Sequence, residues 1–293
     1  MINKIRIGTR GSGLALWQAN FVKDFLEKNR LVNSVEVVKY KTTGDINIAD
    51  NLDVLGGKGV FVKEIEEGLI RKEIDIAVHS YKDVPSELPE DLEIIATSPR
   101  EDFRDVLISN NIELKDLPLN SKIGTGSKRR TFQLNQIRDD FKIVPIRGNI
   151  ETRLRKVFDN ELDAIILAGA ALIRLNLTTD ITSFFSVEEM VPSPLQGFIA
   201  IEARKDSGLT NIFSPFSSDI DKIVSKYERR ALTSLNGSCF LPFGFNLMNY
   251  KKDFICSYFL NNNQKTIKNS IIIKHESIDY EIDSVITELS TIL

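Results

Sequence analysis

The chain has 293 residues, of which 42% are hydrophobic and 27% charged, and its formal net charge is −3. This balance predicts a globular protein of two or three domains and argues against a general nucleic-acid-binding surface. No apolar stretch approaches the roughly 20 residues of a membrane span, and residues 1–9 lack a secretory signal pattern, so we expect a cytoplasmic protein without a membrane segment. Two cysteines are too few for a disulfide framework.

Strand and helix patterns alternate through residues 1–97. Short β-branched runs predict strands at 5–8, 35–40 and 74–78. Apolar positions at the helical period predict a helix over 14–27 and a second one with Phe61, Ile65 and Leu69 on one face. This βαβ order predicts an α/β lobe with a mostly parallel sheet.

The third of these strands ends in charged residues. Lys82 and Asp83 follow its apolar run, and Pro85 prevents the ladder from continuing. Ligands of open α/β sheets bind at the carboxyl edge of the strands. The pair is therefore a candidate for acid–base chemistry, and a solvated surface ion pair is the alternative.

Residues 98–196 repeat the alternation. The expected strands are 106–109, 122–126, 142–146 and 164–167, and the expected helices are 127–138 and 150–158. The extended segments 94–97 and 191–201 would carry the chain out to this second lobe and back. Two such crossings are typical of a hinge.

The pattern changes in the last third of the chain. A helix is expected over 223–235, three strands near 241–248, 254–259 and 266–274, and a closing helix over 280–292. The sequence thus predicts an α/β protein with two periplasmic-binding-protein-like lobes joined by two hinge segments, plus a C-terminal α+β domain with a small three-stranded antiparallel sheet. The expected domains are 1–97 with 197–216, 98–196, and 217–293.

Arginines recur where the expected strands pass into helices. They are Arg10, Arg129, Arg130, Arg147, Arg153 and Arg174. Cations at a helix N-terminus oppose the macrodipole, which indicates an anion there, held by backbone N–H groups and Ser127. A ligand with several carboxylates or phosphates would account for the set, and solvated surface arginines are the alternative.

The sequence has no Walker A lysine motif, no dinucleotide-binding glycine pattern and no metal-ligand spacing, so no metal is expected. His79 and His275 are interpreted as structural. Cys239 lies in a loop and is a candidate nucleophile or attachment point, with an ordinary buried cysteine as the alternative. Cys256 alternates within a strand and is interpreted as core.

Six blocks follow one another across almost the whole chain. They are residues 9–18 (TRGSGLALWQ), 56–64 (GGKGVFVKE), 79–85 (HSYKDVP), 124–130 (GTGSKRR), 146–154 (IRGN and TRL) and 237–239 (GSC). In this order they closely resemble the porphobilinogen deaminase family, also called hydroxymethylbilane synthase. The set is far more specific than any single motif.

The resemblance implies a monomeric transferase of tetrapyrrole and haem biosynthesis. Such an enzyme condenses four porphobilinogen molecules head to tail with loss of ammonia and releases hydroxymethylbilane, which it hands over to uroporphyrinogen-III synthase. The primer would be a dipyrromethane cofactor attached to Cys239 through a thioether.

The resemblance also assigns roles by position. Asp83 would be the catalytic carboxylate. The residues that would hold the primer are Lys82, Asp83, Thr125, Ser127, Arg129, Arg130 and Arg153. Those that would bind the incoming substrate are Arg10, Ser12, Gln18, Arg147, Gly148, Asn149, Arg153, Arg174 and Gln196. Lys58 and Phe61 would belong to a mobile lid.

The chemistry of the implied ligands agrees with these residue types. Each pyrrole bears an acetate and a propionate, so the growing chain needs many guanidinium groups. Loss of ammonia generates an electron-poor azafulvene, and a carboxylate beside the ring nitrogens would stabilise the cation and shuttle protons. Lys82 would keep Asp83 ionised.

The chain departs from the family pattern at a few positions. Leu195, after Pro194, stands where a glycine or similarly small residue is expected before Gln-Gly. Lys128 replaces a usually apolar residue and Ser238 a common glycine, and the tail after Asn249 resembles the family weakly. None of these changes removes an assigned catalytic group.

Two other classes of protein fit part of the pattern. A solute-binding protein or the effector domain of a regulator would explain two lobes and anion-binding arginines, but not the loop cysteine. An acyl- or thiol-transfer enzyme would use Cys239, but no motif places a histidine to activate it.

Overall fold

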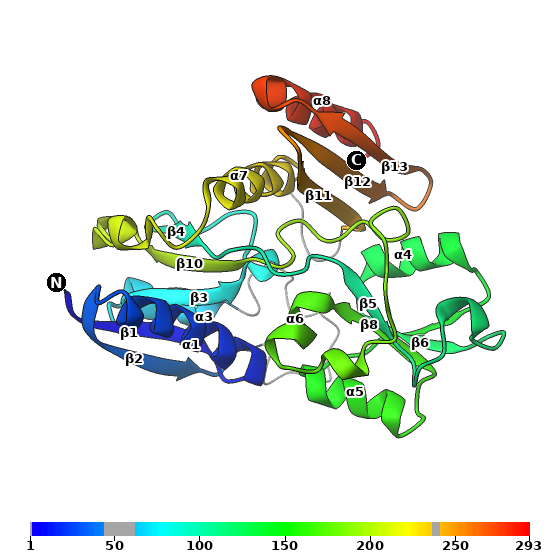
Figure 1. Cartoon of the computed structure of the whole chain (residues 1–293), viewed down its shortest axis with the longest axis horizontal. Helices are drawn as coiled ribbons and strands as arrows, with labels where there is room; N and C mark the ends of the chain where they lie inside the picture. The colour runs from blue at the N-terminus through cyan, green and yellow to red at the C-terminus, as the bar shows by residue number, and fades with distance from the viewer. Residues whose placement is uncertain (1, 44–61, 236–240) are drawn as a thin grey trace. The chain divides into compact units, whose positions relative to one another are not determined.

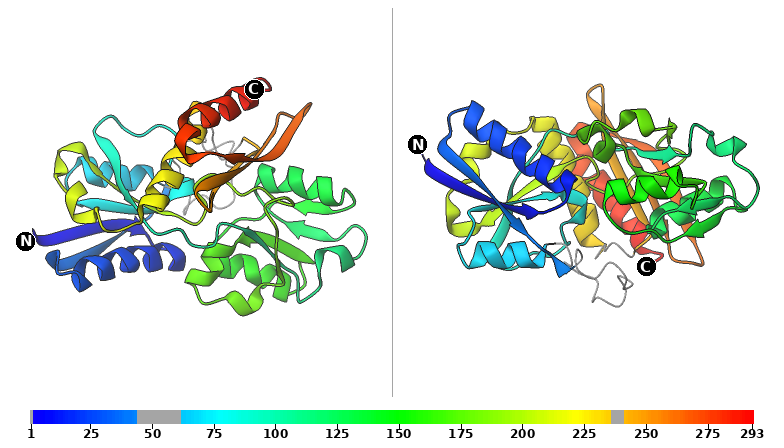
Figure 2. Two further views of the ribbon diagram at one scale, coloured as in Figure 1. Left: turned by 45° about the horizontal axis from the view of Figure 1, so that its top comes forward. Right: turned by 90° about the horizontal axis from the view of Figure 1, so that it is seen from below.

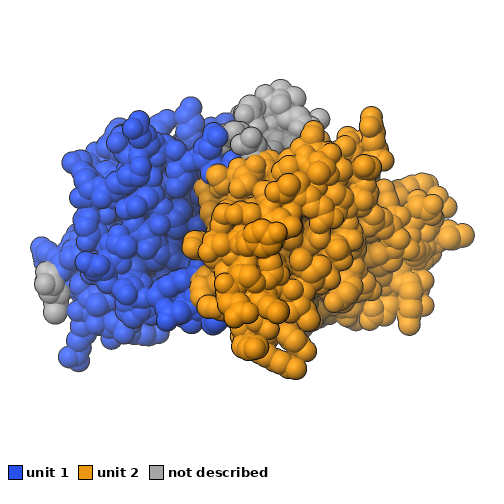
Figure 3. Space-filling view, turned by 90° about the horizontal axis from the view of Figure 1, so that it is seen from above, with its two compact units in different colours: residues 1–101, 198–222 blue, residues 102–197, 223–293 orange. Residues whose placement is uncertain are grey.

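The computed structural model describes residues 2–43, 62–235 and 241–293, and Figure 1 shows their elements. These residues form two compact units, which Figure 3 colours separately. Unit 1 comprises Met1–Glu101 and Phe198–Lys222, and unit 2 comprises Asp102–Gly197 and Ile223–Leu293. The finer division into three domains stays a prediction.

Unit 1 contains a five-stranded sheet. Its strands are β1 (Ile2–Arg10), β2 (Val32–Tyr40), β3 (Ile76–Ser80), β4 (Leu92–Thr97) and β10 (Ile199–Arg204), in the order β2-β1-β3-β10-β4. β1 pairs in parallel with β2 and β3, whereas β10 runs antiparallel to β3 and β4. The sheet is mixed, so the expectation of a mostly parallel sheet was wrong. The chain returns to the unit 1 sheet at the edge where β3 ends, so that Ile199, the first residue of β10, lies opposite Ser80, the last residue of β3. β10 therefore runs antiparallel to β3.

The re-entering strand also changes the interpretation of segment 191–201. This segment was expected to link the lobes, but its last residues belong to β10, an interior strand of the sheet. Residues Ile199, Ile201 and Ala203 are fully buried, as an interior strand requires.

Two helices cover the two faces of this sheet. Ala19, Val22 and Leu26 of α1 (Gly13–Lys28) pack into the same core as Ile76 of β3. Helix α3 (Lys63–Ile70) packs with Ala77, the next residue of β3. Successive side chains of a strand point to opposite faces, so β3 contributes to both cores.

Unit 2 contains a second five-stranded sheet. Its strands are β5 (Asp105–Ile108), β6 (Lys122–Gly124), β7 (Lys142–Val144), β8 (Ala164–Ala168) and β9 (Ser183–Phe184), in the order β7-β6-β8-β5-β9. β6 pairs in parallel with β7 and β8, and β5 is antiparallel to β8 and β9. The helices are α4 (Lys128–Ile137), α5 (Ile150–Phe158) and α6 (Gly169–Arg174). The carboxyl ends of β6, β7 and β8 therefore share one edge.

The C-terminal residues form the small sheet that the sequence predicts. Strands β11 (Phe243–Tyr250), β12 (Asp253–Asn261) and β13 (Thr266–Ile273) are antiparallel neighbours. Helix α8 (Ile278–Ser290) lies along this sheet, as Figure 2 shows, and α7 (Asp219–Ser234) precedes it. Cys256 of β12 is fully buried, and burial raises the pKa of its thiol, which confirms its interpretation as core.

The α/β class of the fold is as expected. In the described part of the chain, no helix combines the length and the apolar composition that crossing a bilayer requires.

Candidate functional site

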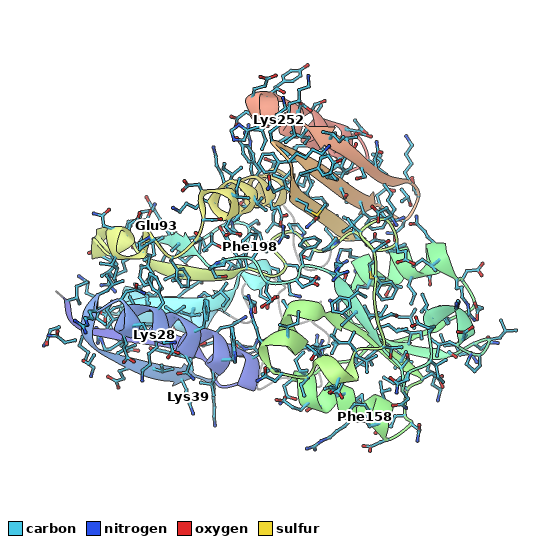
Figure 4. The ribbon with its side chains drawn as sticks, in the orientation of Figure 1. Lys28, Lys39, Glu93, Phe158, Phe198 and Lys252 are labelled. Carbon is cyan, nitrogen blue, oxygen red and sulfur yellow. The ribbon has the colours of Figure 1, made fainter. Side chains whose placement is uncertain are left out.

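Lys82 and Asp83 lie at the carboxyl edge of the unit 1 sheet. β3 ends at Ser80, and one 3-10 turn, η1 (Tyr81–Asp83), follows it. The Tyr81 N–H donates to the carbonyl of Phe198 at 3.0 Å, which anchors the turn. Phe198, labelled in Figure 4, is itself buried. The predicted position of the Lys-Asp pair, just beyond a buried strand, is confirmed.

Asp83 lines a small cavity of about 80 Å³ together with Arg10, Ser12 and Gln18. Arg10 is the last residue of β1, the parallel neighbour of β3. The Ser12 hydroxyl caps α1 by accepting from the Ala15 N–H at 3.4 Å. Four of the residues assigned by resemblance thus meet in one hollow, because two parallel strands end side by side.

The buried amide of Gln18 completes the wall of this cavity. Gln18 is 2% exposed, and its Nε2 donates to Ser80 Oγ at 2.8 Å. The cavity therefore combines one guanidinium, one carboxylate and uncharged polar groups. A guanidinium binds a carboxylate of a ligand, and the Asp83 carboxylate accepts from an N–H or stabilises a cation.

A buried charged cluster lies next to the cavity. His79, which also lines it, places Nε2 at 3.1 Å from Glu202 Oε2. Burial, together with the charge of Glu202, raises the pKa of Glu66 on α3 to about 7. Among the described residues, Glu66 Oε1 and Glu202 Oε1 are buried without a hydrogen-bond partner.

Sequence reasoning missed both glutamates of this cluster. Its structural interpretation of His79 agrees with the contact to Glu202. The sequence signal for Glu202 was its position within the apolar run Ile199–Arg204, because a carboxylate in a buried interior strand needs a partner.

In unit 2, the two adjacent arginines of α4 turn inward to one carboxylate. Asp105, the first residue of β5, is fully buried. Arg130 donates to Asp105 Oδ1 from Nε at 3.0 Å and from Nη2 at 2.7 Å, and Arg129 Nη1 lies 2.8 Å from Oδ2. Both arginines also donate to backbone carbonyls, of Val191 and Ile166.

The electrostatics of this cluster favour an anionic ligand. Burial alone would raise the pKa of the Asp105 carboxyl, but the guanidinium groups of Arg129 and Arg130 hold it well below its usual range. Burial lowers the pKa of Arg129, and Asp105 opposes this shift. Two guanidinium charges against one carboxylate leave a net positive charge in a buried place.

Ser127 lies at the start of α4. Its hydroxyl caps α4 by accepting from the Arg130 N–H at 3.5 Å, and it is itself the N-cap residue. The two arginines bond with Asp105, because a buried carboxylate must be neutralised. Sequence reasoning missed Asp105, whose only signal is a carboxylate at the start of the apolar run Asp105–Ile108.

The other unit 2 residues gather at strand ends and turns. Thr125 is buried, and its Oγ1 accepts from the Ser127 N–H at 3.2 Å. Asn149 caps α5 by accepting from the Thr152 N–H at 2.9 Å. Arg153 donates from Nε to the carbonyl of Gly148 at 2.8 Å, and Arg147 precedes that glycine.

Arg174 and Gln196 make contacts near Gly197, the residue at which the chain leaves unit 2 for unit 1. Gln196 is fully buried and donates from Nε2 to Asp105 Oδ1 at 3.0 Å. Arg174 is 6% exposed and donates from Nη2 to the carbonyl of Gly197 at 2.6 Å. Gln196 thus belongs to the Asp105 cluster, and Arg174 bonds the carbonyl of Gly197, the residue that follows Gln196.

Three of the assigned residues lie outside the described part of the chain: Cys239, Lys58 and Phe61. The rest divide between the two units, with Arg10, Ser12, Gln18, Lys82 and Asp83 in unit 1 and the others in unit 2. Within the described ranges, no group of three or more His, Cys, Asp or Glu side chains is arranged to hold a metal ion.

Comparisons with known proteins show the family to which this chain is related. Residues 5–211 match the family model described as "Porphobilinogen deaminase, dipyromethane cofactor binding domain". The porphobilinogen deaminase of Geobacter sulfurreducens is 47% identical over 242 residues, which are 82% of this chain and 76% of that protein. The one of Campylobacter hominis is 46% identical over 248 residues, which are 84% and 80% of the two chains.

Some solved structures share a distant likeness with the chain. The periplasmic VFT2 domain of Bordetella pertussis BvgS has a TM-score of 0.42 and 12% identity, and the likeness covers 80% of this chain and 92% of that one. The family match and the curated relatives carry the assignment. The chain belongs to the porphobilinogen deaminase family.

Proposed function

We propose that this chain condenses four porphobilinogen molecules head to tail, with loss of ammonia, and releases hydroxymethylbilane. The observation that carries the proposal is the cavity in which Asp83 lies with Arg10, Ser12 and Gln18. It joins a carboxylate, suited to a pyrrole N–H and a developing cation, to a guanidinium, suited to the acidic side chains of the substrate.

Asp83 is the proposed catalytic residue. As ammonia leaves the aminomethyl group of porphobilinogen, positive charge develops on the pyrrole ring, and the Asp83 carboxylate stabilises it. The same carboxylate then accepts the proton that the acceptor ring loses when the new carbon–carbon bond forms. The short turn η1 after β3 supports it on a rigid strand end.

Arg10, Ser12 and Gln18 orient the incoming ring. Arg10 pairs with a substrate carboxylate, while Ser12 and Gln18 supply uncharged hydrogen-bonding groups. Gln18 is fixed by its bond to Ser80, so its amide does not need to be ordered when substrate binds. Arg147, Gly148, Asn149, Arg174 and Gln196 are the proposed partners of the substrate in unit 2.

The residues of unit 2 fit a dipyrromethane cofactor by charge. The Asp105 cluster retains one net positive charge while buried, which suits the carboxylates of a primer. Thr125, Ser127, Arg129, Arg130 and Arg153, with Lys82, are the proposed holders of its acidic side chains, and Cys239 is its proposed attachment point. When bound, this group supplies the free pyrrole carbon to which the first substrate is joined.

The remaining expectations belong to the same proposal. The chain would act as a monomer in the cytoplasm and hand its product over to uroporphyrinogen-III synthase. The lobes would move as the chain grows, with Lys58 and Phe61 near a lid.

The proposal is tested by Asp83→Asn. We expect the variant to fold, to carry the primer and to bind porphobilinogen, but to lose roughly two or more orders of magnitude in turnover, because a positioned acid–base group is removed. Asp91→Asn is the matched control, since Asp91 is an exposed carboxylate of the same unit outside the cavity. Near-normal turnover of purified Asp83→Asn would refute the role of this carboxylate.

A further inference from the structure

Leu195 adopts a backbone conformation that leucine disfavours. Its φ is +65°, in the left-handed region that glycine occupies without steric cost. Its side chain is fully buried, so the residue cannot be treated as a flexible surface turn. The left-handed backbone gives a physical reason for the small residue that the resemblance led us to expect at this position. This chain places a strained residue there and must hold it in place.

Glu228 of α7 stabilises the left-handed backbone of Leu195 by a hydrogen bond. It is fully buried, and its two oxygens accept from two backbone groups: Oε2 from the Leu195 N–H at 2.6 Å and Oε1 from the Leu247 N–H at 2.8 Å. A carboxylate presents acceptors to both donors at once. A glutamine would turn its amide N–H₂ toward one of them.

The two residues after Leu195 contact the proposed binding groups. Gln196 donates to the carbonyl of Phe103 at 2.8 Å and to Asp105 at 3.0 Å. Gly197 has a φ of +95°, and its carbonyl accepts from Arg174 at 2.6 Å. A shift at Leu195 would move both of these contacts, because they belong to consecutive residues.

We propose that Glu228 is a positioning residue of the substrate site. By bonding the Leu195 N–H it fixes the left-handed turn, and through that turn it sets Gln196 against Asp105 and Gly197 against Arg174. The inference rests on the proposed function, which makes Gln196 and Arg174 partners of porphobilinogen. Glu228 itself touches neither substrate nor primer in this scheme.

The competing explanation is that Glu228 serves only to join α7 to β11 through Leu247. The two explanations predict different effects of Glu228→Gln on KM when glycine replaces Leu195. Glycine adopts a positive φ at no steric cost, so it needs less help from Glu228 to keep the turn. The bond to Leu247 is not affected by that change.

The experiment is a double-mutant cycle on the full chain. It comprises wild type, Glu228→Gln, Leu195→Gly and the double variant, with KM for porphobilinogen and kcat measured for each. Losing the buried leucine creates a cavity, but this loss is present in both glycine-containing proteins and cancels in the cycle. Glu288→Gln is the control, because it removes a carboxylate that accepts from Tyr258 at 2.8 Å in the same C-terminal region, with no link to Leu195.

We expect Glu228→Gln to raise KM on the order of tenfold in the Leu195 background, with a much smaller change in kcat, because substrate partners are displaced. In the Leu195→Gly background the same change should raise KM less than about threefold, which is the signature of coupling. Glu288→Gln should leave KM unchanged. Equal KM changes in both backgrounds, or no change in either, would overturn the proposal.

A second measurement keeps the test decisive if Glu228→Gln does not fold. Hydrogen exchange on the wild-type protein reports directly on the Leu195 amide, which should be strongly protected by its bond to Glu228. Exchange of this amide at the rate of an exposed loop would overturn the inference. The proposed function is tested separately, since it fails when wild type itself makes no hydroxymethylbilane.

Discussion

Replacing Asp105 by asparagine should severely destabilise unit 2. The carboxylate is fully buried, and its Oδ1 accepts from Arg130 Nε at 3.0 Å, Arg130 Nη2 at 2.7 Å and Gln196 Nε2 at 3.0 Å. Its Oδ2 forms an ion pair with Arg129 Nη1 at 2.8 Å. Asparagine keeps one acceptor oxygen but turns an N–H₂ group toward guanidinium donors. It also leaves two buried positive charges without a counter-ion.

The expected cost follows from the burial of this ion pair. Removing one partner of a buried pair costs about 3–5 kcal/mol, because the other charge stays buried and unpaired. For a chain of this size, that loss lowers the melting temperature by roughly 10 °C. Thermal unfolding followed by circular dichroism measures it. Asp140→Asn is the control, because its pair with Arg138 is partly exposed and should matter much less.

The stabilisation by Asp105 should also depend on pH with a known sign. The pKa of its carboxyl is lower in the folded protein than in the unfolded chain, so its contribution is complete above the unfolded value and is lost as pH falls through the folded value. The difference in stability between wild type and Asp105→Asn should therefore be constant from pH 6 to 8 and shrink in acid. Equal melting temperatures of the two proteins at pH 7 would refute the reasoning about this cluster.

Two further predictions concern the buried glutamate and the arginines. Burial raises the pKa of Glu66 from 4.5 to about 7, so the folded state binds a proton more tightly than the unfolded chain, and stability falls as pH rises through this range. Glu66→Gln should thus stabilise the protein by up to about 3 kcal/mol at pH 8 and by little below pH 5, measured by urea unfolding; a gain independent of pH would contradict this. Arg147→Leu should arrest elongation, whereas Arg153→Leu should impair primer assembly, and mass analysis of trapped enzyme–pyrrole intermediates would distinguish the two. Full product yield from both variants would mean that neither arginine binds the substrate or the primer.

The parts of the site that the sequence predicted depend on local patterns. Lys82 and Asp83 follow a short buried strand and lie just before Pro85, and Asn149 precedes an amphipathic helix. Such signals involve neighbours along the chain, so one sequence suffices to read them. Most element boundaries were within a few residues for the same reason.

The missed parts depend on tertiary pairing. Asp105 meets Arg130, 25 residues away, and Glu202 meets His79, 123 residues away. Neither partner can be identified from a single sequence without knowing which strand lies beside which. The antiparallel direction of β10 was missed because apolar alternation carries no information on strand direction. The resemblance indicated a small residue at position 195, but the left-handed turn there was not predicted, because leucine seldom adopts a positive φ.

The central claim, that Cys239 carries a dipyrromethane on which the product is built, is tested most directly by the intact mass of the purified protein. A thiolate that adds to the electrophile formed from one porphobilinogen, followed by condensation of a second porphobilinogen with loss of ammonia, would increase the mass by two linked pyrrole units. Digestion should map this increase to the peptide with Cys239 and not to that with Cys256, and Cys239→Ala should lose both the adduct and the product. An unmodified mass in protein made with ample porphobilinogen, together with full activity of Cys239→Ala, would contradict the claim.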